Sequence, residues 1–159
     1  MSSHLAILPV ITPLLVVALQ LLVGEKRRRT VLLLSVVSCV VLVIMAAALM
    51  RTVSADGALA AVYRIGDWPA QFGIVLVADR LSALMVLLTS VLALALLPHA
   101  LGRWQHRGGH FQPLLQFLLV GLNGAFLTGD LFNLFVFFEV LLAASYGLAL
   151  HGSGARRVS

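Results

Sequence analysis

The sequence predicts an all-α integral membrane protein from its composition, its apolar runs and the placement of its charges. Of its 159 residues, 61% are hydrophobic and 11% are charged, and the mean hydropathy is +1.06. Five apolar runs are joined by short connections, which leave too little polar sequence for a soluble domain. A helix of about 20 residues crosses the roughly 30 Å hydrocarbon core of a bilayer. We therefore expect one multi-pass membrane domain, residues 1–159, in contact with lipid.

The five transmembrane helices are predicted at 5–23, 31–50, 77–97, 113–128 and 131–150. The first follows MSSH, which contains no Lys or Arg, so it is expected to be a retained helix and not a cleaved signal peptide. Pro13 should kink this helix, because proline lacks the backbone N–H. Cys39 in the second helix is the single cysteine, which excludes an internal disulfide.

The connection between the second and third helices, 51–76, contains YRIGDWPAQFGIVLVAD at its end and just beyond it. Its β-prone residues flank the turn-forming GDWP, which predicts a short external hairpin-like loop. Asp79 and Ser82 follow at the start of the third helix. One of them is expected to cap that helix, and the alternative is that Asp79 lines an external ion entrance.

The basic residues predict how the helices are oriented. Eight of the eleven follow the first, third or fifth helix: Lys26, Arg27, Arg28, Arg29, Arg103, Arg107, Arg156 and Arg157. Because cytoplasmic loops are enriched in Lys and Arg, the N-terminus should be external and the C-terminus cytoplasmic. These residues flank the apolar runs instead of forming one basic face laced with aromatic residues, so nucleic-acid binding is not expected.

The fourth and fifth helices should form a tight antiparallel hairpin, because Gly129 and Asp130 make up almost the whole turn between them. Asp130 is the expected N-cap of the fifth helix. Glu139 follows nine residues later, which places it roughly 13.5 Å further along the helix axis. That distance puts its carboxyl group close to the middle of the bilayer.

Glu139 is the strongest functional candidate in the sequence. An ionised carboxylate at this depth costs about 2.5–3.5 kcal/mol, so it must face protein or water, be paired, or hold a proton. The last possibility makes it a proton carrier. The alternative is a structural ion pair or a fixed hydrogen bond, but every Lys and Arg lies at the end of a helix or in a loop.

Other polar residues could support a hydrophilic path. Asn123, flanked by glycines in the fourth helix, could hydrogen-bond across the hairpin or line such a path. Tyr146 shares a helical face with Glu139, and Asp79 and Asp130 are further candidates. His99, His106, His110 and His151 lack the spacing of a metal site, so neither a metal nor a cofactor is expected. The sequence also lacks a nucleophile with a matching base, which argues against an enzyme.

Two stretches resemble a known family: GLNGAFLTGDLFNLFVFFEVLLAASYGLALHG at 121–152 and FGIVLVADRLSALMVLLT at 72–89. They are similar to the D subunit of the multisubunit Mrp-type cation/proton antiporters, a relative of the proton-pumping membrane subunits of respiratory complex I and membrane-bound hydrogenases. The resemblance implies a subunit of a hetero-oligomeric complex in the bacterial inner membrane, which exchanges cytoplasmic Na⁺ (or Li⁺ or K⁺) for external H⁺. Glu139 matches an essential proton-path glutamate of that family.

The resemblance also implies a subunit of about fourteen helices, of which this chain would be the N-terminal portion. The lysine that pairs with the matching glutamate lies on a later helix in that family. Two alternatives stay open. One is an antiporter-like subunit of a proton-pumping oxidoreductase, and the other is a structural or assembly protein in which Glu139 makes a fixed hydrogen bond.

Overall fold

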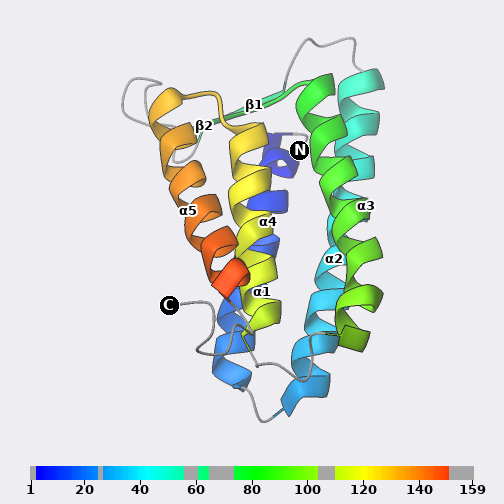
Figure 1. The fold of residues 1–159 in the computed structure, drawn as a ribbon. Coiled ribbons are helices and arrows are strands. Elements are labelled where there is room, and N and C mark those ends of the chain that lie inside the picture. Colours follow the sequence, from blue (N-terminus) through cyan, green and yellow to red (C-terminus); the bar gives the residue numbers. More distant parts are fainter. Residues whose placement is uncertain (1–2, 25–26, 56–60, 65–73, 104–109, 151–159) are drawn as a thin grey trace.

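The computed structural model describes residues 3–24, 27–55, 61–64, 74–103 and 110–150. Within them the chain forms five α-helices, as predicted (Figure 1). In chain order the elements are η1 (Ser3–Ala6), α1 (Leu8–Val23), α2 (Arg28–Ala55), β1 (Ala61–Arg64), β2 (Val75–Ala78), α3 (Arg80–Arg103), α4 (Phe111–Leu127) and α5 (Leu131–Leu150).

Three of these helices contain segments long and apolar enough to cross a membrane: Arg28–Ser54 in α2, Arg80–Pro98 in α3 and Leu131–Leu150 in α5. The helices α1 and α4 are also apolar but have only 16 and 17 residues. At about 1.5 Å per residue they are a few ångströms shorter than the hydrocarbon core. The short 3-10 helix η1 precedes α1 and lengthens the helical segment at that end.

The predicted boundaries agree best for α5, which coincides with 131–150. The predicted start of the third helix is wrong, because residues 77 and 78 belong to β2 and α3 begins at Arg80. Hydropathy alone cannot separate a short apolar strand from the apolar helix that follows it. The helix α2 extends beyond 31–50 at both ends, since hydropathy marks the apolar run and not the end of the helix.

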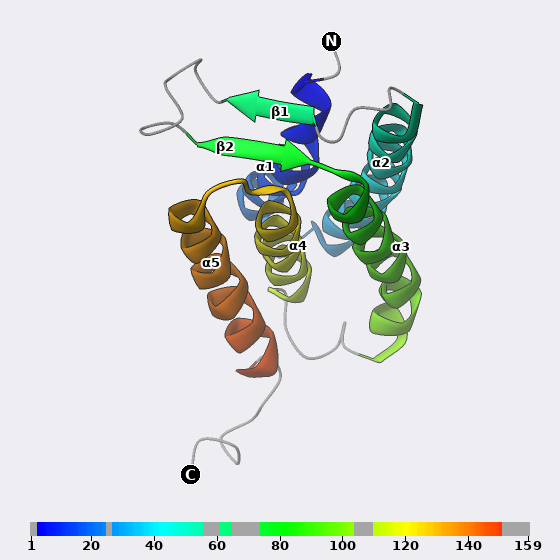
Figure 2. The ribbon, with the colours of Figure 1, turned by 90° about the horizontal axis from the view of Figure 1, so that it is seen from above.

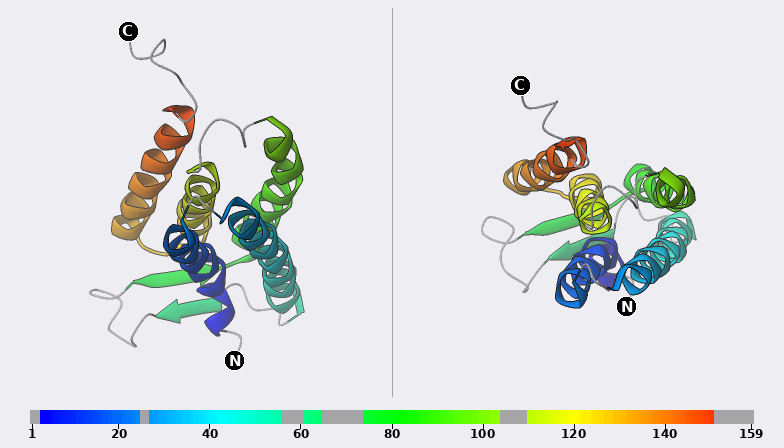
Figure 3. Two further views of the ribbon diagram at one scale, coloured as in Figure 1. Left: turned by 90° about the horizontal axis from the view of Figure 1, so that it is seen from below. Right: turned by 60° about the horizontal axis from the view of Figure 1, so that its bottom comes forward.

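The helix α4 lies at the centre of the bundle. It packs against α1, α3 and α5, whereas α5 packs mainly against α4 and lies at one side of the molecule (Figure 3). Two buried apolar clusters fill the bundle of α1 to α4. One is centred on Leu49, Leu76 and Leu127 near the strands, and the other on Leu42 and Leu97 further along the helices.

The two strands pair antiparallel and lie across one end of the bundle, over α1 and α4 (Figure 2). The carbonyl oxygen of Val75 accepts a hydrogen bond of 2.8 Å from the amide of Gly129, in the turn between α4 and α5. A Cβ atom at Gly129 would come within 2.5 Å of Cγ2 of Val77, so this contact requires glycine. The predicted hairpin-like loop between the second and third helices is therefore present, although its GDWP turn lies outside the described residues.

Candidate functional site

Glu139 is the ninth of the 20 residues of α5. Its side chain lies on the exposed face of the helix, together with Phe135, Leu142 and Tyr146. In the described part of the chain, no hydrogen bond or ion pair reaches its carboxyl group. Tyr146, 70% exposed, lies two turns further along the same face. The geometry thus brings Glu139 and Tyr146 to one face, which no other helix of the described residues covers.

The opposite face of α5 contacts α4 through glycine. A Cβ atom at Gly121 would lie 2.8 Å from the backbone nitrogen of Leu141, and one at Gly124 would overlap the ring of Phe137. Gly147 of α5 lies against Leu114. Such small residues let membrane helices approach closely. This contact fixes the rotation of α5 and turns Glu139 away from α4.

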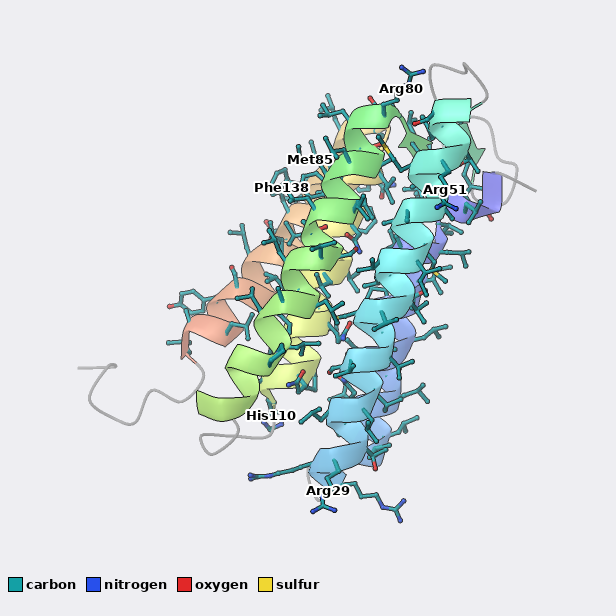
Figure 4. All side chains as sticks on the ribbon, turned by 90° about the vertical axis from the view of Figure 1, so that its right-hand side faces the viewer. Arg29, Arg51, Arg80, Met85, His110 and Phe138 are labelled. Carbon is teal, nitrogen blue, oxygen red and sulfur yellow. The ribbon has the colours of Figure 1, made fainter. Side chains whose placement is uncertain are left out.

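Among the described side chains, the basic ones lie at the two ends of the bundle. Figure 4 shows Arg29 and His110 at one end and Arg51 and Arg80 at the other. The helices α1, α4 and α5 contain no Lys or Arg at all. No basic side chain among the described residues is therefore placed to pair with Glu139. Lys26, Arg107, Arg156 and Arg157 lie outside the described residues.

Asp79 forms a reciprocal cap with Ser82 at the start of α3. The Ser82 amide donates to Asp79 Oδ1 at 2.6 Å, and the Asp79 amide donates to the Ser82 hydroxyl at 2.8 Å. These groups satisfy two amides that a helix start leaves unpaired. Hydrogen bonds from Ser82, first from its backbone N–H and then from its side chain, hold the pKa of Asp79 below its usual value. The capping interpretation of Asp79 is the one that the geometry supports.

Asp130 occupies the N-cap position of α5. Its Oδ2 atom accepts a hydrogen bond of 3.4 Å from the amide of Asn133, and its backbone oxygen accepts one of 2.9 Å from the amide of Leu134. The Thr128 hydroxyl also donates to the backbone oxygen of Asp130, at 3.2 Å. The two aspartates therefore lie at the end of the bundle that holds the strands, each at the start of a helix.

Asn123 is fully buried and bonds to partners that the sequence did not predict. It does not bond across the hairpin to α5. Its Nδ2 atom donates to the carbonyl oxygen of Pro9 in α1 at 2.9 Å, and its Oδ1 atom accepts from the Thr89 hydroxyl in α3 at 3.4 Å. Pro13 has no N–H to give to Pro9, four residues earlier, so the Asn123 amide satisfies the carbonyl that proline leaves free.

A second polar group, which we call the glutamine cluster, lies between α1, α2 and α4 and was missed from the sequence. Its members, all at most 8% exposed, are Gln20, Ser35, Ser38, Gln112 and Gln116. The available signal was that Gln20 and Gln116 each lie inside a predicted apolar helix, with Gln112 one helical turn before Gln116. No single residue of the cluster is charged, which is why none drew attention.

The described residues contain no group of three or more His, Cys, Asp and Glu side chains that could hold a metal ion. Of the four histidines considered above, His106 and His151 lie outside the described residues, and nothing is described of the His99 side chain. His110 precedes α4 at the basic end of the bundle (Figure 4).

The apolar helices, their tight packing and the polar groups between them define a multi-pass helical membrane protein. No protein-family model matches the chain. It is 55% identical over 159 residues to the D subunit of a probable K⁺/H⁺ antiporter of Rhizobium meliloti, a match that covers 98% of this chain. It is 37% identical over 153 residues to the D subunit of the Na⁺/H⁺ antiporter of Bacillus subtilis, over 94% of this chain.

Solved structures of similar fold agree with these sequence similarities. A chain in the Mrp complex from Dietzia sp. DQ12-45-1b superposes with a TM-score of 0.86 at 35% identity, over 94% of this chain and 27% of that one. A chain of the membrane-bound sulfane sulfur reductase, an archaeal respiratory complex, has a TM-score of 0.76 at 24% identity and shows the fold alone. The chain is therefore a relative of the D subunits of the Mrp-type antiporters. It spans 30% of the length of the two curated relatives named above.

Proposed function

We propose that this chain forms part of a membrane subunit of a multisubunit monovalent cation/proton antiporter in the bacterial inner membrane, and that Glu139 carries protons through it. The position of Glu139 is the main support. It lies near the middle of a 20-residue apolar helix, on the face that is turned away from α4. The names of the sequence relatives support the cation/proton exchange.

The exposed face of α5 cannot face lipid throughout. An ionised carboxylate in the bilayer core costs about 2.5–3.5 kcal/mol on insertion scales, and the rest of the bundle offers it no partner among the described residues. We infer that further helices of a longer subunit cover this face and supply the basic partner, together with water. The chain spans only 30% of its curated relatives, which leaves ample length for such helices.

Tyr146 is the most suitable second member of the path. It comes seven positions after Glu139, so its Cα atom lies about 10 Å further along the same face. One or more water molecules would have to bridge this gap. Asp79 and Asp130 would mark the external end, where their negative charge attracts cations and protons. Asn123 is occupied by Pro9 and Thr89, so we assign it to the support of α1 and α4 and not to the path.

The orientation follows from the basic end of the bundle. Arg27, Arg28 and Arg29 would lie in the cytoplasm, with the N-terminus and the strands outside. An Arg29→Cys variant should react with a membrane-impermeant maleimide in everted vesicles but not in whole cells. Reaction from the outer side of intact cells would reverse the proposed topology.

The transport proposal is tested in the full-length subunit, expressed with all its partner subunits. Na⁺-, Li⁺- and K⁺-dependent proton movement is measured in everted vesicles for the wild type, Glu139→Gln and Glu139→Asp. Glutamine keeps hydrogen bonding but cannot titrate, so Glu139→Gln should abolish exchange, whereas Glu139→Asp keeps a titratable group and should retain part of it. Normal exchange by an assembled Glu139→Gln complex would favour a structural or assembly role.

An antiporter-like subunit of a proton-pumping oxidoreductase is the second candidate. The fold that the chain shares with the sulfur reductase complex favours it, but at 24% identity this likeness concerns the fold alone. The two candidates differ in what drives proton movement. Cation gradients should drive it in an antiporter, whereas in the alternative it should require an electron donor and acceptor.

A further inference from the structure

The glutamine cluster joins three helices through hydrogen bonds. Gln20 Nε2 of α1 donates to the Ser35 hydroxyl of α2 at 2.7 Å and to the carbonyl oxygen of Val31 at 3.2 Å. The Ser38 hydroxyl donates to Gln116 Oε1 of α4 at 3.1 Å, and Gln116 Nε2 approaches the carbonyl oxygen of Ser35 at 3.5 Å. Gln116 therefore uses both polar atoms of its amide on α2, whereas Gln20 uses only its nitrogen there.

Two buried oxygens in this cluster have no partner. Gln20 Oε1 and Gln112 Oε1 are both buried, and neither accepts a hydrogen bond from the described residues. Turning the Gln20 amide over would not help, because its oxygen would then face the carbonyl oxygen of Val31 and its nitrogen would be left without a partner. A buried acceptor without a donor is destabilising, so native proteins rarely keep one.

The two oxygens lie at a similar level in the bundle. Gln20 bonds to Val31 and Ser35, while Gln116 bonds to Ser35 and Ser38. Gln112 lies one turn before Gln116, and α4 runs in the same direction as α2 (Figure 1). It therefore lies near the level of Val31 on α2. Because α1 packs against α4, the orphan oxygens come from neighbouring helices.

We propose that the glutamine cluster binds ordered water inside the bundle, and that this water donates hydrogen bonds to Gln20 Oε1 and Gln112 Oε1. Water fits because it can donate to both oxygens and accept from a serine hydroxyl, as buried water does in other proteins. A cation fits less well. No carboxylate belongs to the cluster, and the amide nitrogens of Gln20 and Gln116 are turned into it.

This site is separate from the proposed proton path. It lies on the face of α4 toward α1 and α2, whereas Glu139 lies on α5, beyond the glycine contact. It is also closed toward Asn123, since the buried apolar side chains of Leu119 and Val120 lie between Gln116 and Asn123 on α4. The water therefore stabilises the contact between α1, α2 and α4, and it does not conduct protons across the bundle.

The variant Gln112→Met tests this proposal, because bound water decides whether the substitution lowers or raises the thermal unfolding midpoint. Gln112 makes no hydrogen bond with the described residues, so methionine removes its amide and keeps a similar volume. If no water binds to Gln112 Oε1, removing this unpaired oxygen should raise the thermal unfolding midpoint of the full-length subunit in its complex. If water is bound, the variant loses that water and the midpoint should fall.

The matched control is Leu119→Met, a buried position of α4 that has no polar atom to lose. We expect the midpoint of Gln112→Met to lie below that of Leu119→Met. A map of the complex that resolves buried water should show density within hydrogen-bonding reach of both oxygens. A midpoint equal to or above the control, or a map in which the site is empty or holds a cation, would overturn the proposal.

Discussion

Polar groups inside apolar helices occur in two contrasting settings in this molecule. In the bundle of α1 to α4 they are neutral and buried, and most of them are paired, as in the bonds of Asn123 to Pro9 and Thr89. On α5 the charged group is the carboxyl group of Glu139, which is exposed and has no partner among the described residues. A paired neutral amide can hold helices together permanently. A carboxyl group on an open face instead needs something that lies outside these helices.

The contrast depends on the glycine contact that holds α5 against α4. Disrupting this contact should have the largest effect of the substitutions proposed below, on the assembly of the subunit. In Gly121→Val, the new side chain would meet the backbone of Leu141, which cannot move without displacing the helix. We expect loss of the assembled full-length subunit, measured by blotting of purified complexes. The control is Ala125→Val on the same helix, a half-buried position, which should assemble. Normal assembly of Gly121→Val would mean that α5 does not pack in this way.

The pairing of Asn123 can be broken and then repaired. Asn123→Ala leaves the carbonyl oxygen of Pro9 without a donor, which should cost about 1–3 kcal/mol of stability. In a Pro13→Ala background, residue 13 regains an N–H that can bond to Pro9, so the same Asn123→Ala change should cost less. A double-mutant cycle of unfolding midpoints measures the difference. Equal costs in the two backgrounds would show that Asn123 does not compensate for the proline.

The capping role of Asp79 predicts a smaller effect that depends on pH. Asp79→Ala should cost about 1 kcal/mol through loss of the cap, and Asp79→Asn, which can still cap, should cost less. The lowered pKa of Asp79 means that its ionised form is favoured in the folded state. The stability that ionised Asp79 contributes is therefore fully present at a pH above the pKa of Asp79 in the unfolded chain. It is lost as the pH falls through the pKa of Asp79 in the folded protein.

Acid unfolding of the wild type and of Asp79→Asn checks the direction in which the stabilisation by Asp79 changes with pH. The stability difference between them should shrink as the solution is acidified through the acidic range in which carboxyl groups titrate. A difference that stays constant, or one that grows toward low pH, would contradict the stabilisation of the ionised carboxylate by Ser82.

The sequence was sufficient to predict the number of helices, the tight turn before α5 and the cap at Asp130, because apolar runs and turn residues are local signals. It was not sufficient for the start of α3, where the strand Val75–Ala78 and the helix form one apolar stretch. The partners of Asn123 and the glutamine cluster depend on which helices become neighbours. No local pattern contains that information.

Glu139 was selected from the sequence for the same reason that it stands out in the structure, which is a charge without a local partner. Its exposed face could not be predicted. Helical periodicity groups it with Phe135 and Tyr146, but only the glycine contact between α4 and α5 shows that this face is turned outward. Of the two small residues one turn apart on α5, Ala143 is exposed, whereas Gly147 lies against Leu114 of α4.

Glu139→Gln and Asn123→Ala, compared in the same full-length complex, test the difference between the two settings most directly. Cation-dependent proton movement in everted vesicles is divided by the amount of assembled complex. We predict that Glu139→Gln assembles normally and loses transport per complex, whereas Asn123→Ala assembles less well and retains it. Full transport per complex by Glu139→Gln would contradict the role of Glu139 as a proton carrier.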